Sequence, residues 1–176
     1  MIDRVAVVGA GTMGHGIAQV CAMAGYDVRL ADADEESARR GAERIRANLE
    51  EGVKRGKLAE SAVEEHMSRI TVAPTLEAAC DGAHIIIEAV PEKIELKRVV
   101  LQRAERAAAT SALLASNTSS LSIGDMQAWL SRPSQFLGLH FFNPVHINKL
   151  VEVVRGPRTE EATVERGLEL VKRIGK

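Results

Sequence analysis

A glycine-rich turn between an apolar run and an amphipathic segment constrains this fold more than any other feature. Residues 4–9 form a continuous apolar run, and Gly9, Gly11 and Gly14 follow in the spacing G-x-G-x-x-G. In a strand–turn–helix unit the first glycine permits the tight turn and the second lets the backbone approach a pyrophosphate. The third allows close helix–strand packing, and the free N–H groups of the helix face the phosphates. The pattern predicts a dinucleotide site.

An acidic residue after the second apolar run indicates which dinucleotide is bound. Residues 27–31 are typical of a strand, and Asp32 follows them, 23 residues after Gly9, where a ribose-binding carboxylate is expected. A carboxylate accepts hydrogen bonds from both ribose hydroxyls but repels a 2′-phosphate, and no arginine follows at once. We therefore predict NAD rather than NADP. The alternative is that Asp32 caps a helix, although Asp34 is better placed for that role.

Short apolar runs alternate with longer amphipathic segments along the whole chain. The predicted strands are 4–9, 27–31, 69–72, 84–90, 113–115, 136–141 and 150–154, and the predicted helices are 12–24, 35–51, 58–68, 92–108, 123–130 and 159–174. This order predicts an α/β fold with a mostly parallel sheet and helices on both faces. The connection between the last two strands is too short for a helical crossover, so we expect that pair to be antiparallel.

Composition excludes several classes of function. The 176 residues carry a net charge of −1 and only 3% aromatic side chains, so we expect no nucleic acid partner. No apolar run approaches the roughly 20 residues that cross a bilayer, and the N-terminus does not resemble a signal peptide. Cys21 and Cys80 are expected to be free thiols in a reducing cytoplasm. No metal site is predicted.

His140 is the candidate acid/base group, because it ends an apolar strand at the carboxyl edge where ligands of such sheets collect. Hydride transfer from an alcohol also requires a base for the hydroxyl proton, and histidine suits that role near neutral pH. Glu152 is the only acid in the next predicted strand, and an acid among aliphatic residues needs a partner to be buried. If the two strands are adjacent, these side chains can meet. The alternative is an exposed strand glutamate and a capped histidine.

Three further segments stand in order along the chain: ASNTSSL at 115–121, GLHFFNPV at 138–145 and LVEVV at 150–154. Together with VGAGTMG at 8–14 they resemble the L-3-hydroxyacyl-CoA dehydrogenase family. The resemblance covers essentially residues 1–176 as the N-terminal, NAD-binding Rossmann domain of that family. It implies NAD-dependent oxidation of a (3S)-hydroxyacyl-CoA to the 3-ketoacyl-CoA, or the reverse, in lipid and acyl-CoA metabolism.

The resemblance also implies roles for individual residues. His140 would be the general acid/base, Glu152 the carboxylate that orients it, and Ser119 the hydrogen-bond partner of the substrate oxygen. The implied cofactor-binding residues are Gly9, Gly11, Thr12, Met13, Gly14, Asp32, Glu92, Lys97, Ser119 and Asn143. The segment with Asn48, Lys54 and Arg55 is similar to the one that meets CoA, and a solvated helix face is the alternative.

The family normally continues with a mostly helical C-terminal domain that supplies the dimer interface and covers the acyl chain. We expect that domain to be absent here, either because the chain is truncated or because it is a free-standing NAD-binding half. We therefore expect NAD binding with weak or absent turnover, and a need for the C-terminal domain or a homodimer partner for full activity.

Two other functions remain open. The first is a non-catalytic NAD-binding module. The second is a β-hydroxyacid dehydrogenase, which starts with a similar glycine turn but relies on a catalytic lysine. The segment HFFNP at 140–144 disfavours this second alternative.

Overall fold

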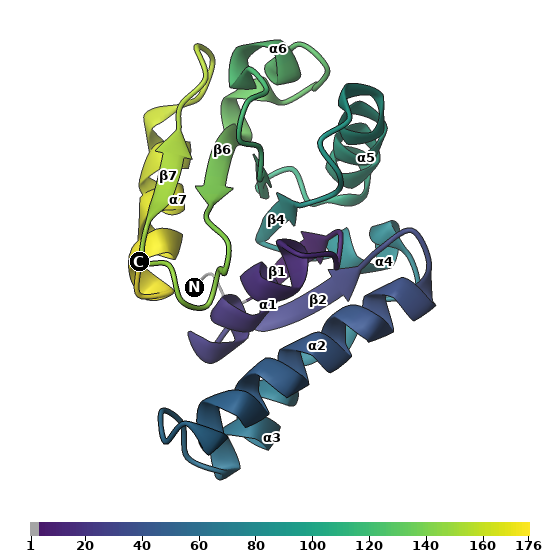
Figure 1. Cartoon of the computed structure of the whole chain (residues 1–176). Coiled ribbons are helices and arrows are strands. Elements are labelled where there is room, and N and C mark those ends of the chain that lie inside the picture. Colours follow the sequence, from purple (N-terminus) through teal and green to yellow (C-terminus); the bar gives the residue numbers. More distant parts are fainter. Residues whose placement is uncertain (1–3) are drawn as a thin grey trace.

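The computed structural model describes residues 4–176, which build a seven-stranded sheet flanked by helices (Figure 1). The strands are β1 (Arg4–Val8), β2 (Asp27–Ala31), β3 (Ile70–Val72), β4 (Ile85–Glu88), β5 (Leu113–Ser116), β6 (Phe136–Phe141) and β7 (Val151–Val154). The helices are α1 (Gly14–Met23), α2 (Glu35–Lys54), α3 (Ser61–Met67), α4 (Leu76–Cys80), α5 (Ile94–Ala107), α6 (Ile123–Gln127) and α7 (Glu161–Arg173), with a 3₁₀ turn at Pro133–Gln135. The prediction for the N-terminus falls mainly on residues 1–3, outside the described part.

The sheet has the strand order β3-β2-β1-β4-β5-β6-β7. Every neighbouring pair from β3 to β6 is parallel, and β6 and β7 are antiparallel. The order reverses at β1, which lies between β2 and β4. A reversal of this kind leaves a crevice at the carboxyl ends of the strands, where ligands bind. The predicted α/β class, with its mostly parallel sheet and late antiparallel pair, is confirmed.

Two hydrophobic layers cover the two faces of the sheet. In β1, Val5 and Val7 belong to one layer and Ala6 and Val8 to the other, because successive side chains point to opposite faces. Helices α1, α2 and α7 contribute to the first layer, and α4, α5 and α6 to the second. Burying one Val or Ile side chain contributes about 1.5–3 kcal/mol, so a strand buried on both faces is a strong anchor for the turn that follows it.

The start of α5 differs from the sequence pattern, and one short helix is not predicted by it. Helix α5 begins at Ile94 rather than at residue 92, because Lys93 is still extended (φ −123°, ψ 118°). Glu92 therefore lies in the loop after β4 and is free to reach across to the next loop. The pattern also does not predict the five-residue helix α4, which is too short for a periodic signal. Its cap is Thr75, whose hydroxyl accepts a hydrogen bond from Ala78 N at 3.1 Å.

Both cysteines are buried and free, and burial raises the pKa of each thiol to about 12. They are therefore packing residues rather than reactive thiols. Within the described residues, no helix is long and apolar enough to cross a membrane.

Candidate active site

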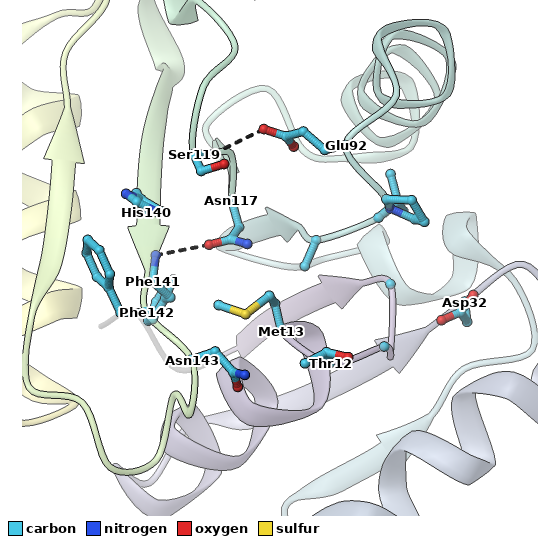
Figure 2. Close-up of a pocket in the computed structure, with 15 residues that line it drawn as sticks. Thr12, Met13, Asp32, Glu92, Asn117, Ser119, His140, Phe141, Phe142 and Asn143 are labelled. Atoms are coloured by element: carbon cyan, nitrogen blue, oxygen red, sulfur yellow. Dashed lines mark hydrogen bonds between the residues drawn. The ribbon is translucent and has the colours of Figure 1, made fainter.

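A pocket of about 540 Å³ opens at the carboxyl ends of the parallel strands (Figure 2). Its walls come from the glycine turn, the end of β2, the loops after β4 and β5, and the end of β6. The lining residues are Gly9, Gly11, Thr12, Met13, Asp32, Ala89, Val90, Pro91, Glu92, Asn117, Ser119, His140, Phe141, Phe142 and Asn143. The structure thus brings most of the residues implied by the family resemblance into one cavity.

The glycine turn fits a dinucleotide. Gly9 has φ +101°, and a Cβ there would lie 2.6 Å from the carbonyl oxygen of Ala89. A Cβ at Gly11 would meet no described atom within 4 Å, so this glycine faces open space where a phosphate can approach. A Cβ at Gly14 would lie 1.6 Å from Gly9 O. Gly14 lies outside the pocket lining, and the absence of a side chain there lets α1 pack closely on the turn.

Asp32 lies at the pocket end of β2 and braces the glycine turn. Its Oδ2 accepts a hydrogen bond from Ala10 N at 2.6 Å, and its Oδ1 accepts one from Ala33 N at 2.6 Å. The alternative that Asp32 caps a helix is wrong. Asp34 is the N-cap of α2 and accepts a hydrogen bond from Ser37 N at 2.7 Å, which lowers the pKa of Asp34.

The antiparallel pair places His140 directly opposite Glu152. His140 Nδ1 lies 2.7 Å from Glu152 Oε2, and the ring of Phe142 packs 4.3 Å from the imidazole centroid. The side chain of His140 is 19% exposed and that of Glu152 is 53% exposed. The two groups therefore meet, but the expectation that Glu152 is buried is wrong. It lies on the outer strand of the described sheet, where water reaches the carboxylate.

Glu92 crosses from the loop after β4 to the loop that carries Ser119 (Figure 2). Its Oε1 accepts hydrogen bonds from the Thr118 hydroxyl and from Ser119 N, the latter at 3.1 Å. Burial opposes ionisation of this carboxyl group, but the Thr118 bond and the nearby Lys97 ammonium hold the pKa of Glu92 below its ordinary value. A charged carboxylate therefore fixes the position of the Ser119 backbone.

Lys97, one of the implied cofactor-binding residues, lies outside the pocket lining. Its side chain is fully buried and lies 2.8 Å from Glu88 Oε1 and 3.1 Å from Glu92 Oε2. Burial raises the pKa of Glu88 above its ordinary value, while the Lys97 ammonium opposes that shift. Glu88 was not foreseen as part of the site. Two signals were available: an acid ending a β-branched strand, and Lys97 in the buried stripe of α5 with Val100 and Leu101.

The residues implied to meet CoA lie outside the pocket lining. Asn48 Nδ2 donates a hydrogen bond to Gln19 Oε1 at 3.0 Å, and Arg55 forms an exposed ion pair with Glu51 at 2.7 Å. Lys54 is exposed at the end of α2. Thr12, Met13 and Asn143, in contrast, all line the pocket, and Figure 2 shows them around the start of α1.

A glycine turn on a buried strand, a carboxylate at the end of the next strand and a pocket at a topological switch point define a dinucleotide-binding α/β domain of the Rossmann type. The family model described as "3-hydroxyacyl-CoA dehydrogenase, NAD binding domain" matches residues 4–176. The chain belongs to this family of NAD-binding domains, and NAD is its cofactor.

Known proteins agree with this assignment. The chain is similar to a probable 3-hydroxybutyryl-CoA dehydrogenase of Bacillus subtilis, with 41% identity over 99% of this chain and 61% of that protein. It is 36% identical to the mitochondrial hydroxyacyl-coenzyme A dehydrogenase of Rattus norvegicus, over 100% of this chain and 58% of that protein. The crystal structure of (S)-3-hydroxybutyryl-CoA dehydrogenase from Ralstonia eutropha has a TM-score of 0.97 and 36% identity, covering 100% of this chain and 62% of that one. The chain thus spans about 60% of the length of these relatives.

Proposed function

We propose that the protein interconverts (3S)-hydroxyacyl-CoA and 3-ketoacyl-CoA with NAD, as part of acyl-CoA and lipid metabolism in the cytoplasm. The observation that carries this proposal is the 2.7 Å contact between His140 Nδ1 and Glu152 Oε2 at the edge of the dinucleotide pocket. An acid/base group held by a carboxylate beside a hydride acceptor is the arrangement that alcohol oxidation requires. The names of the similar proteins support the choice of substrate class.

His140 performs the proton transfer in this mechanism. Glu152 accepts the hydrogen bond from Nδ1–H of the neutral imidazole, which leaves Nε2 as the nitrogen that takes the hydroxyl proton. The carboxylate then stabilises the imidazolium that forms. Ser119 orients the substrate oxygen from the loop after β5. NAD would supply the acceptor for the hydride from C3 of the substrate.

The remaining pocket residues hold the dinucleotide. Gly9, Gly11 and the N–H groups at the start of α1 would hold the pyrophosphate, together with Thr12 and Met13. Asp32 would accept hydrogen bonds from the ribose hydroxyls. Glu92, which holds the Ser119 backbone, and Asn143, which lies beside the start of α1, would position the nicotinamide end.

A group of cations supports an acyl-CoA substrate. The pKa of His146 lies below its ordinary value, first because of burial and then because of nearby positive charges. The charged groups are Lys176, Arg55 and Lys57, and the His15 imidazole lies with them. They come from the start of α1, the end of α2, and the C-terminus, so distant segments gather positive charge close to the connection after β6. CoA carries several phosphates, and Arg55 and the adjacent Lys54 would bind them. Asn48 lies more than one helical turn before Lys54 in α2 and would contact the same ligand.

We also propose that these 176 residues alone bind NAD and turn over weakly. Glu152 is 53% exposed, so water reaches the acid/base pair from the outer strand. Exclusion of water strengthens the electrostatic interactions on which such a site depends. A C-terminal domain of the family or a homodimer partner would complete the cover over the substrate. This chain spans about 60% of the length of the relatives, so the rest of their length is enough for such a domain.

The test is oxidation of NADH in the presence of acetoacetyl-CoA, followed by the absorbance of NADH. We expect consumption of NADH that depends on acetoacetyl-CoA, weak for the 176 residues and faster after a C-terminal domain from a relative is added. NADH binding is measured in parallel by fluorescence titration. A protein that binds NADH but consumes none in either mixture would instead be a non-catalytic NAD-binding module.

A further inference from the structure

The end of β6 extends beyond the strand that supports it. β5 pairs with β6 only as far as Ser116 opposite Gly138, whereas β6 continues to Phe141. Its last residues are paired on the other side by β7, with His140 opposite Glu152. On the β5 side, the end of β6 that carries His140 therefore has no paired strand.

The side chain of Asn117 takes the place of that neighbour. Asn117 is the first residue after β5, and its Oδ1 accepts a hydrogen bond from Phe141 N at 3.0 Å (Figure 2). The amide group of an asparagine has the same acceptor as a peptide group. One side chain thus supplies an acceptor that a longer β5 would have supplied to the residue after His140.

Buried groups beneath the pocket hold Asn117 itself. Its backbone N donates to the carbonyl oxygen of Glu88 at 2.7 Å, and its carbonyl oxygen accepts from Lys97 Nζ at 3.1 Å. Lys97 Nζ also donates to both carboxylate oxygens of Glu88, at 2.8 and 3.0 Å. The neighbouring Ser116 hydroxyl donates to Glu88 Oε2. A buried ion pair with these bonds has a single arrangement, because any displacement would leave a charge unpaired.

We propose that Asn117 is a positioning residue that sets the location of His140, with the buried Lys97 ammonium as its anchor. The proposal rests on the proposed function. A continuous chain of hydrogen bonds leads from Lys97 through Asn117 to Phe141 N, and His140 is the adjacent residue. Lys97 therefore acts through the protein framework and Asn117 acts through the backbone of β6, without either group taking part in proton transfer.

The decisive variants are Asn117→Ala and Asn117→Asp, each made in the full 176-residue chain. Alanine removes the acceptor for Phe141 N, whereas aspartate keeps an oxygen at that position. A displacement of about 1 Å at a reacting group costs on the order of 100-fold in rate. We expect Asn117→Ala to lower kcat for acetoacetyl-CoA reduction by roughly 10- to 100-fold, and Asn117→Asp to be about 10-fold more active than Asn117→Ala. The Kd for NADH should stay within about threefold of wild type in both variants.

Amide hydrogen exchange at Phe141 tests the positioning without any reliance on activity. We expect protection in wild type and in Asn117→Asp, and faster exchange in Asn117→Ala. The matched control is Gln102→Ala, which removes another side-chain amide bonded to the backbone: Gln102 Nε2 donates to the carbonyl oxygen of Trp129 at 2.9 Å, away from the pocket. This control should leave kcat and Phe141 protection unchanged.

Three results would overturn the proposal: an Asn117→Ala protein with at least half of the wild-type kcat, unchanged protection of Phe141 in that variant, or a Kd for NADH that rises as much as kcat falls. The last result would assign Asn117 to cofactor binding. If wild type itself consumes no NADH, the proposed function fails, and the exchange at Phe141 still decides whether Asn117 positions the strand.

Discussion

Two pairs of a basic and an acidic side chain lie at the carboxyl edge of the sheet, and they differ in burial rather than in distance. Lys97 Nζ is 2.8 Å from Glu88, and His140 Nδ1 is 2.7 Å from Glu152. Both side chains of the first pair are fully buried. Those of the second are 19% and 53% exposed. The first pair lies beneath the pocket, and the second lies at its edge, on the outer two strands.

The difference in burial separates a pair that holds the structure from a pair that can exchange a proton. The buried Glu88 carboxylate also accepts hydrogen bonds from Val90 N and Ser116 Oγ, so neutralising either charge would leave a buried partner unsatisfied. His140, in contrast, lines the pocket, and its partner Glu152 is half-exposed to solvent. The imidazole can therefore take up and release a proton. The comparison predicts that changes in the buried pair alter stability and that changes in the exposed pair alter turnover.

The largest effect is expected from His140→Gln. Loss of a general acid/base lowers turnover by roughly 10²- to 10⁴-fold, because glutamine cannot take the hydroxyl proton. NADH should still bind, since the glycine turn and Asp32 are untouched. The free energy of unfolding should change by no more than about 1 kcal/mol, as is typical of exposed pairs. Measured kcat, NADH affinity and urea unfolding check this, and near-normal turnover would remove His140 from its assigned role.

The next effect concerns stability and tests the buried pair. Lys97→Met leaves the Glu88 carboxylate without its cation, and breaking one partner of a buried pair costs about 3–5 kcal/mol. Adding Glu88→Gln to the same chain removes the uncompensated charge and should recover at least half of the loss. Urea unfolding followed by circular dichroism measures both. A loss below about 1 kcal/mol for the single variant would mean that burial is not what distinguishes the two pairs.

The same contrast explains what the sequence could and could not predict. The glycine turn and the antiparallel pair follow from local patterns: an apolar strand ending in glycines, and two strands with a short connection. The register of that pair then places His140 opposite Glu152. These features depend on residues that are near in sequence or directly paired, so the pattern carries them.

The sequence pattern does not predict the buried hydrogen-bond network around Lys97. The contacts of Lys97 with Glu88 and Asn117 join residues from α5, β4 and the loop after β5, which meet only after the sheet has formed. The family resemblance identified Glu92 and Lys97, but not that one lines the pocket while the other lies beneath it. Asn117 belongs to the segment ASNTSSL at 115–121, yet its role depends on β5 ending before β6 does.

A smaller effect on turnover is expected from Glu152→Gln. Glutamine keeps a polar contact with Nδ1 but lacks the charge that stabilises the imidazolium. A hydrogen bond to a charged group contributes about 1.5–3 kcal/mol, which corresponds to roughly a 10- to 100-fold loss in turnover. The matched control is Glu161→Gln in the exposed pair with Arg155, 2.6 Å apart and away from the pocket. Equal losses of kcat in the two variants would show that the effect is not specific to the acid/base pair.

The smallest effect concerns Glu92, which is 35% exposed and lies between the two extremes. Its pKa is below the ordinary value of 4.5 in the folded protein, so its contribution to stability is present above about pH 4.5 and is lost as the pH falls through the folded value. Solvent screening limits this contribution to less than about 1 kcal/mol. The stability difference between wild type and Glu92→Gln should therefore shrink as the pH falls.

Glu88 provides the opposite sign within the same site. Its folded pKa is raised, so its titration favours the folded state at low pH, and this contribution is lost as the pH rises through the folded value. Urea unfolding of wild type, Glu92→Gln and Glu88→Gln across the acidic range should give pH dependences of opposite direction for the two variants. Parallel dependences would mean that the two carboxylates share one environment, and the division of this edge into a buried and an exposed region would then be wrong.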